Sequence, residues 1–408
     1  MSRLGPALLA LLVILAACDR SKSPADGWLA RLTVVPSPAA SGSRYPNLAA
    51  GAEGEIVLSW LQPLPEAGFA LQHSMWNGAA WGPQRTVIAG SDWFINWADF
   101  PSVVPVTGKI WAAHWLQQKP GNVYSYDVRI AVSTDAGASW SAPMSPHDDG
   151  TPTEHGFVSL FGVAGMPQAV WLDGRHTSGE HDHSGGAQGA MTLRGAAIEA
   201  GGQRSGEDLE IDVRVCDCCQ TDVALTASGP VVVYRDRSER EVRDIALVRQ
   251  TADGWSAAVR VHDDGWVIDA CPVNGPAVDA RGDSVVVAWF TAPDTPRVRL
   301  AFSGDAGRSF SPPVEVASGK VAGRVDVVLL EDGRAVVSWL ADGERGAEVR
   351  AQPFRHDGAS GPAVVIAQTS IARSSGFPQM VRAEGGLLFA WTESGDPPQV
   401  RTALARLR

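Results

Sequence analysis

The stretches Glu55-Ile56-Val57-Leu58-Ser59-Trp60 and Ser284-Val285-Val286-Val287-Ala288-Trp289 decide the fold, because each is an apolar run that ends in an aromatic residue. Short apolar runs bounded by turn residues are typical of fully buried strands. Runs of this kind recur along the chain, and successive aromatics lie between 50 and 63 residues apart. The aromatics that end them are Trp60, Trp115, Trp171, Tyr234, Trp289, Trp339 and Trp391.

Each unit has room for four short strands, and four strands in about 50 residues is the spacing of a β-propeller. We therefore predict an all-β fold, a β-propeller of seven four-stranded blades. Six blades are the alternative, because the spacing of 63 residues contains an insertion. The last unit has room for only three strands, so the strand pattern at residues 31–35 is expected to supply the fourth. Such pairing closes the ring and removes an open sheet edge.

The composition fits a soluble globular protein. The chain has 408 residues, of which 45% are hydrophobic and 19% charged, and its net charge is −11. This negative charge argues against binding to nucleic acid or to anionic membrane surfaces. All-β folds often exceed the usual domain length, so residues 27–408 are expected to form one propeller domain, as a monomer.

The N-terminus has the pattern of an export signal. Arg3 precedes a short apolar stretch that is too short for an ordinary membrane helix. Leu15-Ala16-Ala17-Cys18 resembles the bacterial lipobox, which implies that residues 1–17 are removed and that Cys18 is lipidated. Residues 18–26 would then be a polar tether. These patterns predict a lipid anchor to a membrane of the bacterial cell envelope, on its periplasmic face. An ordinary secretory signal is the alternative.

Two segments carry a recurring turn motif. Residues 133–140 read Ser-Thr-Asp-Ala-Gly-Ala-Ser-Trp, and residues 303–310 read Ser-Gly-Asp-Ala-Gly-Arg-Ser-Phe. Both resemble the Asp-box (BNR repeat) of the sialidase-like β-propeller family. Aspartate and glycine favour a tight turn, so the motif points to architecture and not to chemistry. The expected structural residues are Ser133, Asp135, Gly137, Trp140, Ser303, Asp305, Gly307 and Phe310.

The family resemblance also implies what a working sialidase would require. Such enzymes hold the substrate carboxylate with three arginines and use a Tyr–Glu pair and an Asp. Arg44-Tyr45-Pro46 resembles the family's first arginine motif, and Arg237, Arg243 and Arg324 could supply further guanidinium groups. The family's tyrosine lies late in the chain, but this chain has no tyrosine after Tyr234. The catalytic residues therefore remain unassigned.

Polar residues gather where the first strand of each unit begins. First strands line the channel of a propeller, and ligands commonly bind at one mouth of that channel. Turn or capping roles are the ordinary alternative for each residue. The ligand-binding residues expected at the mouth, for a carbohydrate or a protein partner, are Arg44, Asn47, Asp99, His155, Arg324 and Asp326.

Four cysteines are expected to meet at neighbouring inner strands. Aligning the units places Cys218 opposite Cys271, while Cys216 and Cys219 lie beside Cys218 in the sequence. Disulfides, a soft-metal thiolate site for copper(I) or zinc, and buried free thiols all fit this pattern. His176, His181 and His183 form a second candidate metal-binding segment, with a solvated loop as the alternative.

The sequence therefore supports three functional hypotheses. The favoured one is a membrane-tethered propeller that binds a ligand at the channel mouth. The second is a sialidase-like glycoside hydrolase, and the third is copper or zinc handling through the cysteines. Independently of these, the alternating charges at residues 234–237 and 241–244 favour cross-strand ion pairs.

Overall fold

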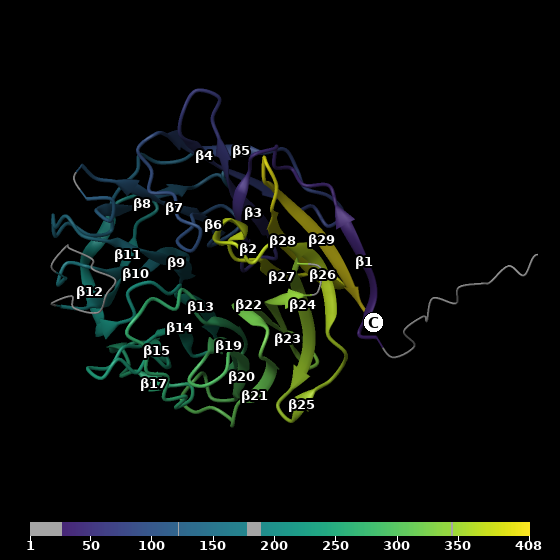
Figure 1. Ribbon diagram of the computed structural model, residues 1–408. Helices are drawn as coiled ribbons and strands as arrows, with labels where there is room; N and C mark the ends of the chain where they lie inside the picture. Colours follow the sequence, from purple (N-terminus) through teal and green to yellow (C-terminus); the bar gives the residue numbers. More distant parts are fainter. Residues whose placement is uncertain (1–26, 121, 178–188, 344–345) are drawn as a thin grey trace, which may run out of the picture.

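The computed structural model describes residues 27–120, 122–177, 189–343 and 346–408. Across these residues the strands form seven sheets, which Figure 1 shows arranged around a ring. In the first six sheets the chain runs from the innermost strand outward before it enters the next sheet. The seven-bladed, all-β propeller predicted from the aromatic spacing is confirmed, and the six-bladed alternative is wrong. Among the described residues, no helix is long and apolar enough to cross a membrane.

Each blade is built from consecutive short strands. The first blade contains β2 (Arg44–Ala50), β3 (Ile56–Pro63), β4 (Phe69–Met75) and β5 (Arg85–Gly90). The second contains β6 (Ser102–Pro105), β7 (Trp111–Gln118) and β8 (Tyr126–Ser133). The third contains β9 (His155–Val163), β10 (Met166–Asp173), β11 (Met191–Ile198) and β12 (Arg204–Val215). The fourth blade contains β13 (Asp222–Thr226), β14 (Gly229–Arg235), β15 (Ile245–Thr251), β16 (Gly254–Trp255) and β17 (Val259–Arg260). The fifth contains β18 (Ala277–Arg281), β19 (Ser284–Thr291), β20 (Arg297–Ser303) and β21 (Val314–Ser318). The sixth blade contains β22 (Val321–Leu329), β23 (Ala335–Gly343), β24 (Gly346–Arg355), β25 (Gly358–Ala359) and β26 (Val364–Thr369). The seventh contains β27 (Gln379–Ala383), β28 (Gly386–Glu393) and β29 (Gln399–Leu407), preceded by the 3-10 turn η1 (Arg373–Ser375).

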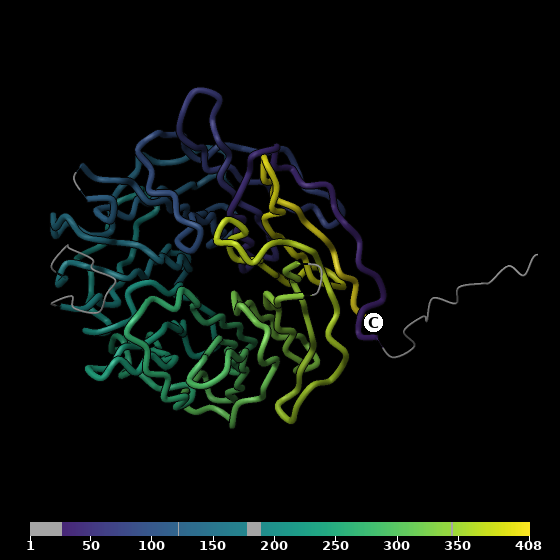
Figure 2. The backbone as a smooth tube through the Cα atoms, viewed as in Figure 1, coloured from purple at the N-terminus to yellow at the C-terminus, as the bar shows by residue number. Residues whose placement is uncertain are grey.

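The N-terminal strand closes the ring. β1 (Leu29–Val35) pairs antiparallel with β29, with Val34 opposite Ala403, and becomes the outermost strand of the seventh blade. Figure 2 shows the purple N-terminal segment beside the yellow C-terminal one. The predicted closure by residues 31–35 is therefore confirmed. The second blade has three strands, and an isolated pairing of Ile130 with Met144 takes the place of a fourth.

The hydrophobic core lies between the blades. Within the described residues, each buried cluster draws its side chains mainly from two adjacent sheets. The recurring aromatic of each second strand is buried, and in six blades it packs toward the preceding blade. Since both faces of a sheet are covered, the central residues of the second strands are buried without a break, which explains mainly apolar runs such as residues 56–60.

The two Ser-x-Asp-x-Gly segments form the same turn. Ser139 donates its backbone N–H to Oδ1 of Asp135 at 2.8 Å, and Ser309 does the same to Asp305 at 2.9 Å. In both copies the glycine has positive φ and donates to the serine hydroxyl. Each turn follows the third strand of its blade. The closing aromatic, Trp140 or Phe310, packs against the cluster shared with the preceding blade.

The inner strands begin with a repeated irregularity. Tyr45, Phe157 and Arg324 have φ between 50° and 54°, and all three lie where an inner strand begins or has just begun. Val273, shortly before β18, has a φ of 47°. The pairing register shifts at the first three positions, as in a β-bulge. A bulge redirects the side chains that follow it, and non-glycine residues with positive φ tend to gather at functional sites.

Candidate functional site at the channel mouth

A cavity of about 390 Å³ opens at the end of the channel where the inner strands begin. Its walls come from the segments before or at the start of the inner strands of five blades, from the turn between β7 and β8 with the start of β8, and from the turn between β14 and β15. The cavity adjoins a central cavity of about 440 Å³ lined by all seven inner strands, since Ala98 and Phe157 line both. The polar and aromatic residues of the mouth cavity include Phe94, Trp97, Tyr124, Tyr126, Glu154, Asp217, Cys218, Arg237, Arg243, Asp269, Cys271 and Arg373.

A buried acidic group lies on one wall of this cavity. The Tyr126 hydroxyl donates to Oε2 of Glu154 at 3.3 Å, and the carboxylate of Asp99 lies beside the same hydroxyl. Asp99 also accepts the backbone N–H of Phe157 at 2.8 Å. The Phe94 ring stacks on Tyr126 with centroids 4.0 Å apart and covers its face. Two carboxyl groups and a phenol are therefore held together with little access to water.

Burial shifts the ionisation of this group. It raises the pKa of Asp99 to about 7, and burial together with the Asp99 charge raises the pKa of Glu154 to about 8. Burial and the two carboxylates also raise the pKa of Tyr126 well above its usual value. The group thus retains a carboxylic proton near neutral pH. Such a proton can be donated to a bound ligand or to a leaving group.

Three arginines line the same cavity. Arg237 bonds to Asp217 at 2.9 Å and to Glu241 at 2.8 Å, and Arg243 bonds to Glu241 at 2.8 Å. Of these contacts, Arg237 with Glu241 is a pair of the kind that the alternating charges predicted across this turn. Arg373, in η1, is exposed on the opposite side of the mouth. The cavity therefore combines two buried, paired guanidinium groups with one that solvent reaches.

The four cysteines of the propeller meet at the rim of this cavity. The Sγ atom of Cys216 lies 3.6 Å from that of Cys219 and 4.0 Å from that of Cys218. Cys218 interacts with Cys271, as the alignment of the units suggested, and Cys216, Cys218 and Cys219 are not joined in a disulfide. Burial raises the pKa of Cys216, but its neighbouring thiols and the Arg243 charge outweigh burial and hold that pKa well below its usual value.

Asn47, Asp99 and Asp326 all line the central channel cavity. Asn47 donates to Gln379 at 3.4 Å, whereas Asp326 accepts the backbone N–H of Met380 at 2.6 Å. Asp222 and Asp279 bond in the same way to the inner strand of the following blade. These carboxylates therefore fasten adjacent blades. Asp222 and Asp279 were not predicted from the sequence, although an aspartate recurs on the inner strands of three successive units and could have revealed them.

Arg44 and Arg324 do not line either cavity. The Arg44 guanidinium lies 5.5 Å from the centre of the Phe69 ring. Arg324 is buried, and its guanidinium donates to the Ser375 hydroxyl at 2.6 Å and to the carbonyls of residues 371, 372 and 376. It also lies 4.7 Å from the centre of the Trp97 ring. The expectation that Arg324 faces a ligand is corrected, because its guanidinium fixes the backbone around η1, beside the mouth. That Arg44 binds a ligand stays a prediction.

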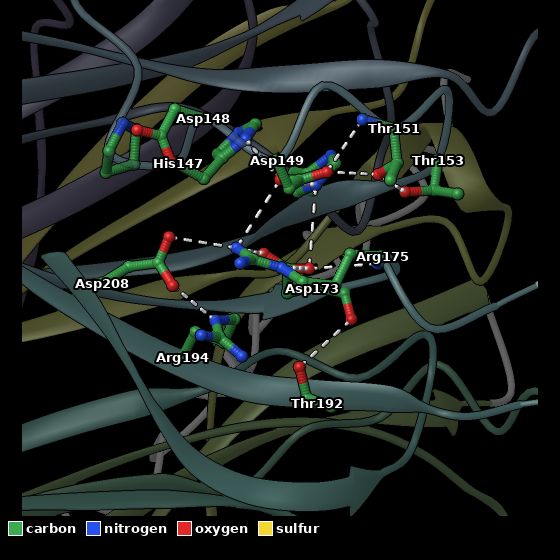
Figure 3. Close-up of polar contacts among 12 residues, drawn as sticks. His147, Asp148, Asp149, Thr151, Thr153, Asp173, Arg175, Thr192, Arg194 and Asp208 are labelled. Atoms are coloured by element: carbon green, nitrogen blue, oxygen red, sulfur yellow. Dashed lines mark hydrogen bonds and ion pairs between the residues drawn. The ribbon is translucent and has the colours of Figure 1, made fainter.

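His155 is also turned away from the mouth. It is fully buried, its Nε2 lies 3.0 Å from Oδ2 of Asp149, and its ring stacks on His147 with centroids 3.8 Å apart. Figure 3 shows the surrounding polar network, in which Arg175 contacts both Asp173 and Asp208. This network joins the second blade to the third. Its neighbour Glu154, which was not predicted from the sequence, does line the mouth cavity.

The remaining candidate residues lie elsewhere. His176 is exposed, and its Nε2 lies 3.6 Å from a Glu210 oxygen. His181 and His183 lie outside the described residues, as does Cys18.

Comparisons with known proteins agree with the fold. No protein-family model matches the chain, and no curated protein sequence matches it. A solved protein of unknown function from Dyadobacter fermentans is 14% identical, with a TM-score of 0.50, over 93% of this chain and 99% of that one. The endosialidase of phage phi92 is 9% identical, with a TM-score of 0.49, over 94% and 69%. Trypanosoma rangeli sialidase is 12% identical, with a TM-score of 0.43, over 79% and 56%. At such identities the likeness concerns the fold alone, and the class it defines is the β-propeller.

Proposed function

We propose that this protein is a lipid-anchored propeller of the sialidase-like, Asp-box type, exposed at the periplasmic face of the bacterial cell envelope, which binds a carboxylate-bearing carbohydrate in the mouth cavity. The observation that carries this proposal is the make-up of that cavity. Arg237, Arg243 and Arg373 line it together with the Tyr126–Glu154 pair and the ring of Trp97.

The size and chemistry of the cavity support such a ligand. A volume of about 390 Å³ is in the range of small-ligand sites, which place a few polar groups in an aromatic surround. Guanidinium groups recognise carboxylates through charge and paired hydrogen bonds. Because Arg237 and Arg243 are already paired with acidic side chains, the exposed Arg373 is the group we expect to contact the ligand carboxylate.

Calorimetric titration with a panel of sugars tests this proposal. The panel should contain sialic acid, uronic acids and the matching neutral sugars. We expect measurable binding of an acidic sugar, and at least a tenfold weaker affinity for Arg373→Ala, as the loss of about 1.4 kcal/mol would give. Arg355→Ala, which removes an exposed arginine of the sixth blade, is the matched control and should bind normally. Equal binding by both variants would refute the assigned role of Arg373.

The lipid anchor rests on residues 15–18 of the sequence. Its test is the fractionation of cells that produce the full chain. We expect the protein in the membrane fraction, and Cys18→Ser in the soluble fraction without incorporated fatty acid. A Cys18→Ser chain that still fractionates with membranes would contradict the anchor.

A second candidate function is glycoside hydrolysis, favoured by one specific observation. Tyr126 bonds to Glu154 beside Asp99, which gives the cavity the tyrosine and carboxyl groups that a sialidase-like enzyme requires. Tyr126 was not predicted from the sequence, because the family's tyrosine lies late in the chain. Glu154 accepts a proton from Tyr126 only when it is ionised, so turnover should increase as pH rises toward 8.

A panel of fluorogenic sialosides and uronides tests this candidate. We expect Tyr126→Phe to abolish turnover while the variant still binds the sugar. If the unaltered protein releases no fluorophore from any member of the panel between pH 5 and pH 9, hydrolysis of these glycosides is refuted and the binding proposal stands by itself.

A further inference from the structure

The cysteine cluster is a separate feature of the mouth, because carbohydrate binding does not require four thiols. Within the described residues, the Sγ atoms of Cys216, Cys218 and Cys219 all lie within 4.8 Å of one another. Cys271 comes from the loop before the next inner strand and interacts with Cys218. Two adjacent blades thus bring their thiols to one point of the rim.

The spacing of the sulfur atoms matches metal coordination. A metal ion about 2.3 Å from each thiolate separates the sulfurs by about 3.8 Å in a tetrahedral site and about 4.0 Å in a trigonal one. Cys216 has one neighbour at 3.6 Å and another at 4.0 Å. Two of the three sulfur separations are thus close to those of ligands around a shared metal ion, and the third is within 4.8 Å.

The charges around the cluster fit a bound thiolate complex. Nη1 of Arg243 lies 3.3 Å from Sγ of Cys216, and Glu241 holds the same guanidinium in place. Three thiolates around a monovalent ion carry a net negative charge, which a buried site must offset. A disulfide is neutral, so it would not use the positive charge that Arg243 places beside Cys216.

Access to the cluster is built into the mouth. Cys216 and Cys219 are buried, whereas Cys218 and Cys271 line the mouth cavity. An ion can therefore enter past Cys271, reach Cys218 and be bound by Cys218 together with the two buried thiols. Thiolates select copper(I) and zinc among biological cations. Zinc sites of this kind are almost always four-coordinate, whereas here three sulfurs form the compact group.

We propose that Cys216, Cys218 and Cys219 bind copper(I), and that Cys271 lies at the opening of this site. The proposal is independent of the carbohydrate site, since its ligands are the thiols alone.

The test uses the full chain, purified without chelators and reduced under anaerobic conditions. Copper(I) is titrated against a chromophoric copper(I) chelator, and X-ray absorption identifies the atoms bound to copper. We expect one equivalent of copper(I) to be retained, with sulfur as its only ligand. Cys216→Ser and Cys219→Ser should lose that equivalent. Met75→Leu, which removes an exposed sulfur outside the cluster, and His176→Ala should retain it.

Three results would overturn the proposal. In the first, the reduced chain fails to retain copper(I) against the chelator. In the second, zinc displaces copper(I) and is bound by four sulfurs. In the third, X-ray absorption of the unaltered protein shows copper bound by nitrogen or oxygen; this measurement needs no cysteine variant to fold. A copper-binding result leaves the carbohydrate proposal untouched, because Arg373→Ala tests that proposal separately.

Discussion

The hydroxyl of Tyr126 and the carboxyl of Glu154 form a hydrogen bond of 3.3 Å that joins the second and third blades beside the mouth cavity. Tyr126 begins β8, whereas Glu154 directly precedes β9. The contact thus depends on two blades meeting at this edge. It also explains why a carboxyl group is buried at the site.

The burial of Glu154 makes stability depend on pH. Its pKa rises from 4.5 to about 8 on folding, so the folded state keeps a proton that the unfolded state loses. The free energy of unfolding should therefore fall as pH rises from about 4.5 to about 8. We expect Glu154→Gln to reduce this fall and to be more stable than the unaltered protein at pH 8.5, by on the order of 2 kcal/mol. Chemical denaturation at pH 5.5 and pH 8.5 measures this, with the exposed Glu66→Gln as control. An unchanged pH dependence in Glu154→Gln would contradict the assignment.

The inner-strand aspartates should contribute to blade packing. Asp326→Ala leaves the backbone N–H groups of Val327 and Met380 without their acceptor and should cost about 1–3 kcal/mol. Asp326→Asn keeps an acceptor oxygen and should cost less. Urea denaturation measures both, with the exposed Asp253→Ala as control. Equal stability of Asp326→Ala and the control would show that this contact does not fasten the sixth blade to the seventh.

Gly137 is expected to be intolerant of any side chain. An added Cβ would lie 2.7 Å from the His73 ring and 2.9 Å from the Trp111 ring, at a φ of +74°. Gly333 has a similar φ of +79° with no atom within 4 Å. Gly333→Ala should therefore cost only the backbone strain, about 1 kcal/mol, whereas Gly137→Ala should cost about 3 kcal/mol. Thermal denaturation compares the two variants. An equal loss of stability in both would mean that Gly137 does not lie in close contact with His73 of the first blade.

Arg324 should control the mouth indirectly. Its guanidinium binds the carbonyls around η1, which carries Arg373. We expect Arg324→Met to increase hydrogen exchange at residues 371–376 and to weaken sugar binding, because Arg373 is no longer held in place. Arg355→Ala again serves as control. Unchanged hydrogen exchange at residues 371–376 in Arg324→Met would show that Arg324 does not position Arg373.

The ring could be predicted from the sequence because its cause is local and repeated. An apolar run ending in an aromatic residue must be buried on both faces, and seven such runs at near-constant spacing require seven stacked sheets. The meeting of Cys218 and Cys271 also followed, because units that superimpose in sequence superimpose in space. Closure by residues 31–35 followed from the missing strand of the last unit.

The direction of individual side chains could not be predicted in the same way. Arg324 lies at a bulge with a φ of 50°, and its side chain turns to the backbone of η1 and not to the channel. His155 begins a strand whose register shifts nearby. A register shift of one residue moves each side chain to the other face of the strand, and nothing in the local sequence predicts these shifts. The Tyr126–Glu154 pair was missed because it forms between blades.

The most direct test of the mouth as the binding site is a crystal structure with the acidic sugar that binds most tightly in the panel. We predict that the sugar lies in the mouth cavity, with its ring against Trp97 and its carboxylate bonded to Arg373. A sugar bound on the outer strands of a blade, with the mouth cavity free of it, would refute the mouth as the binding site.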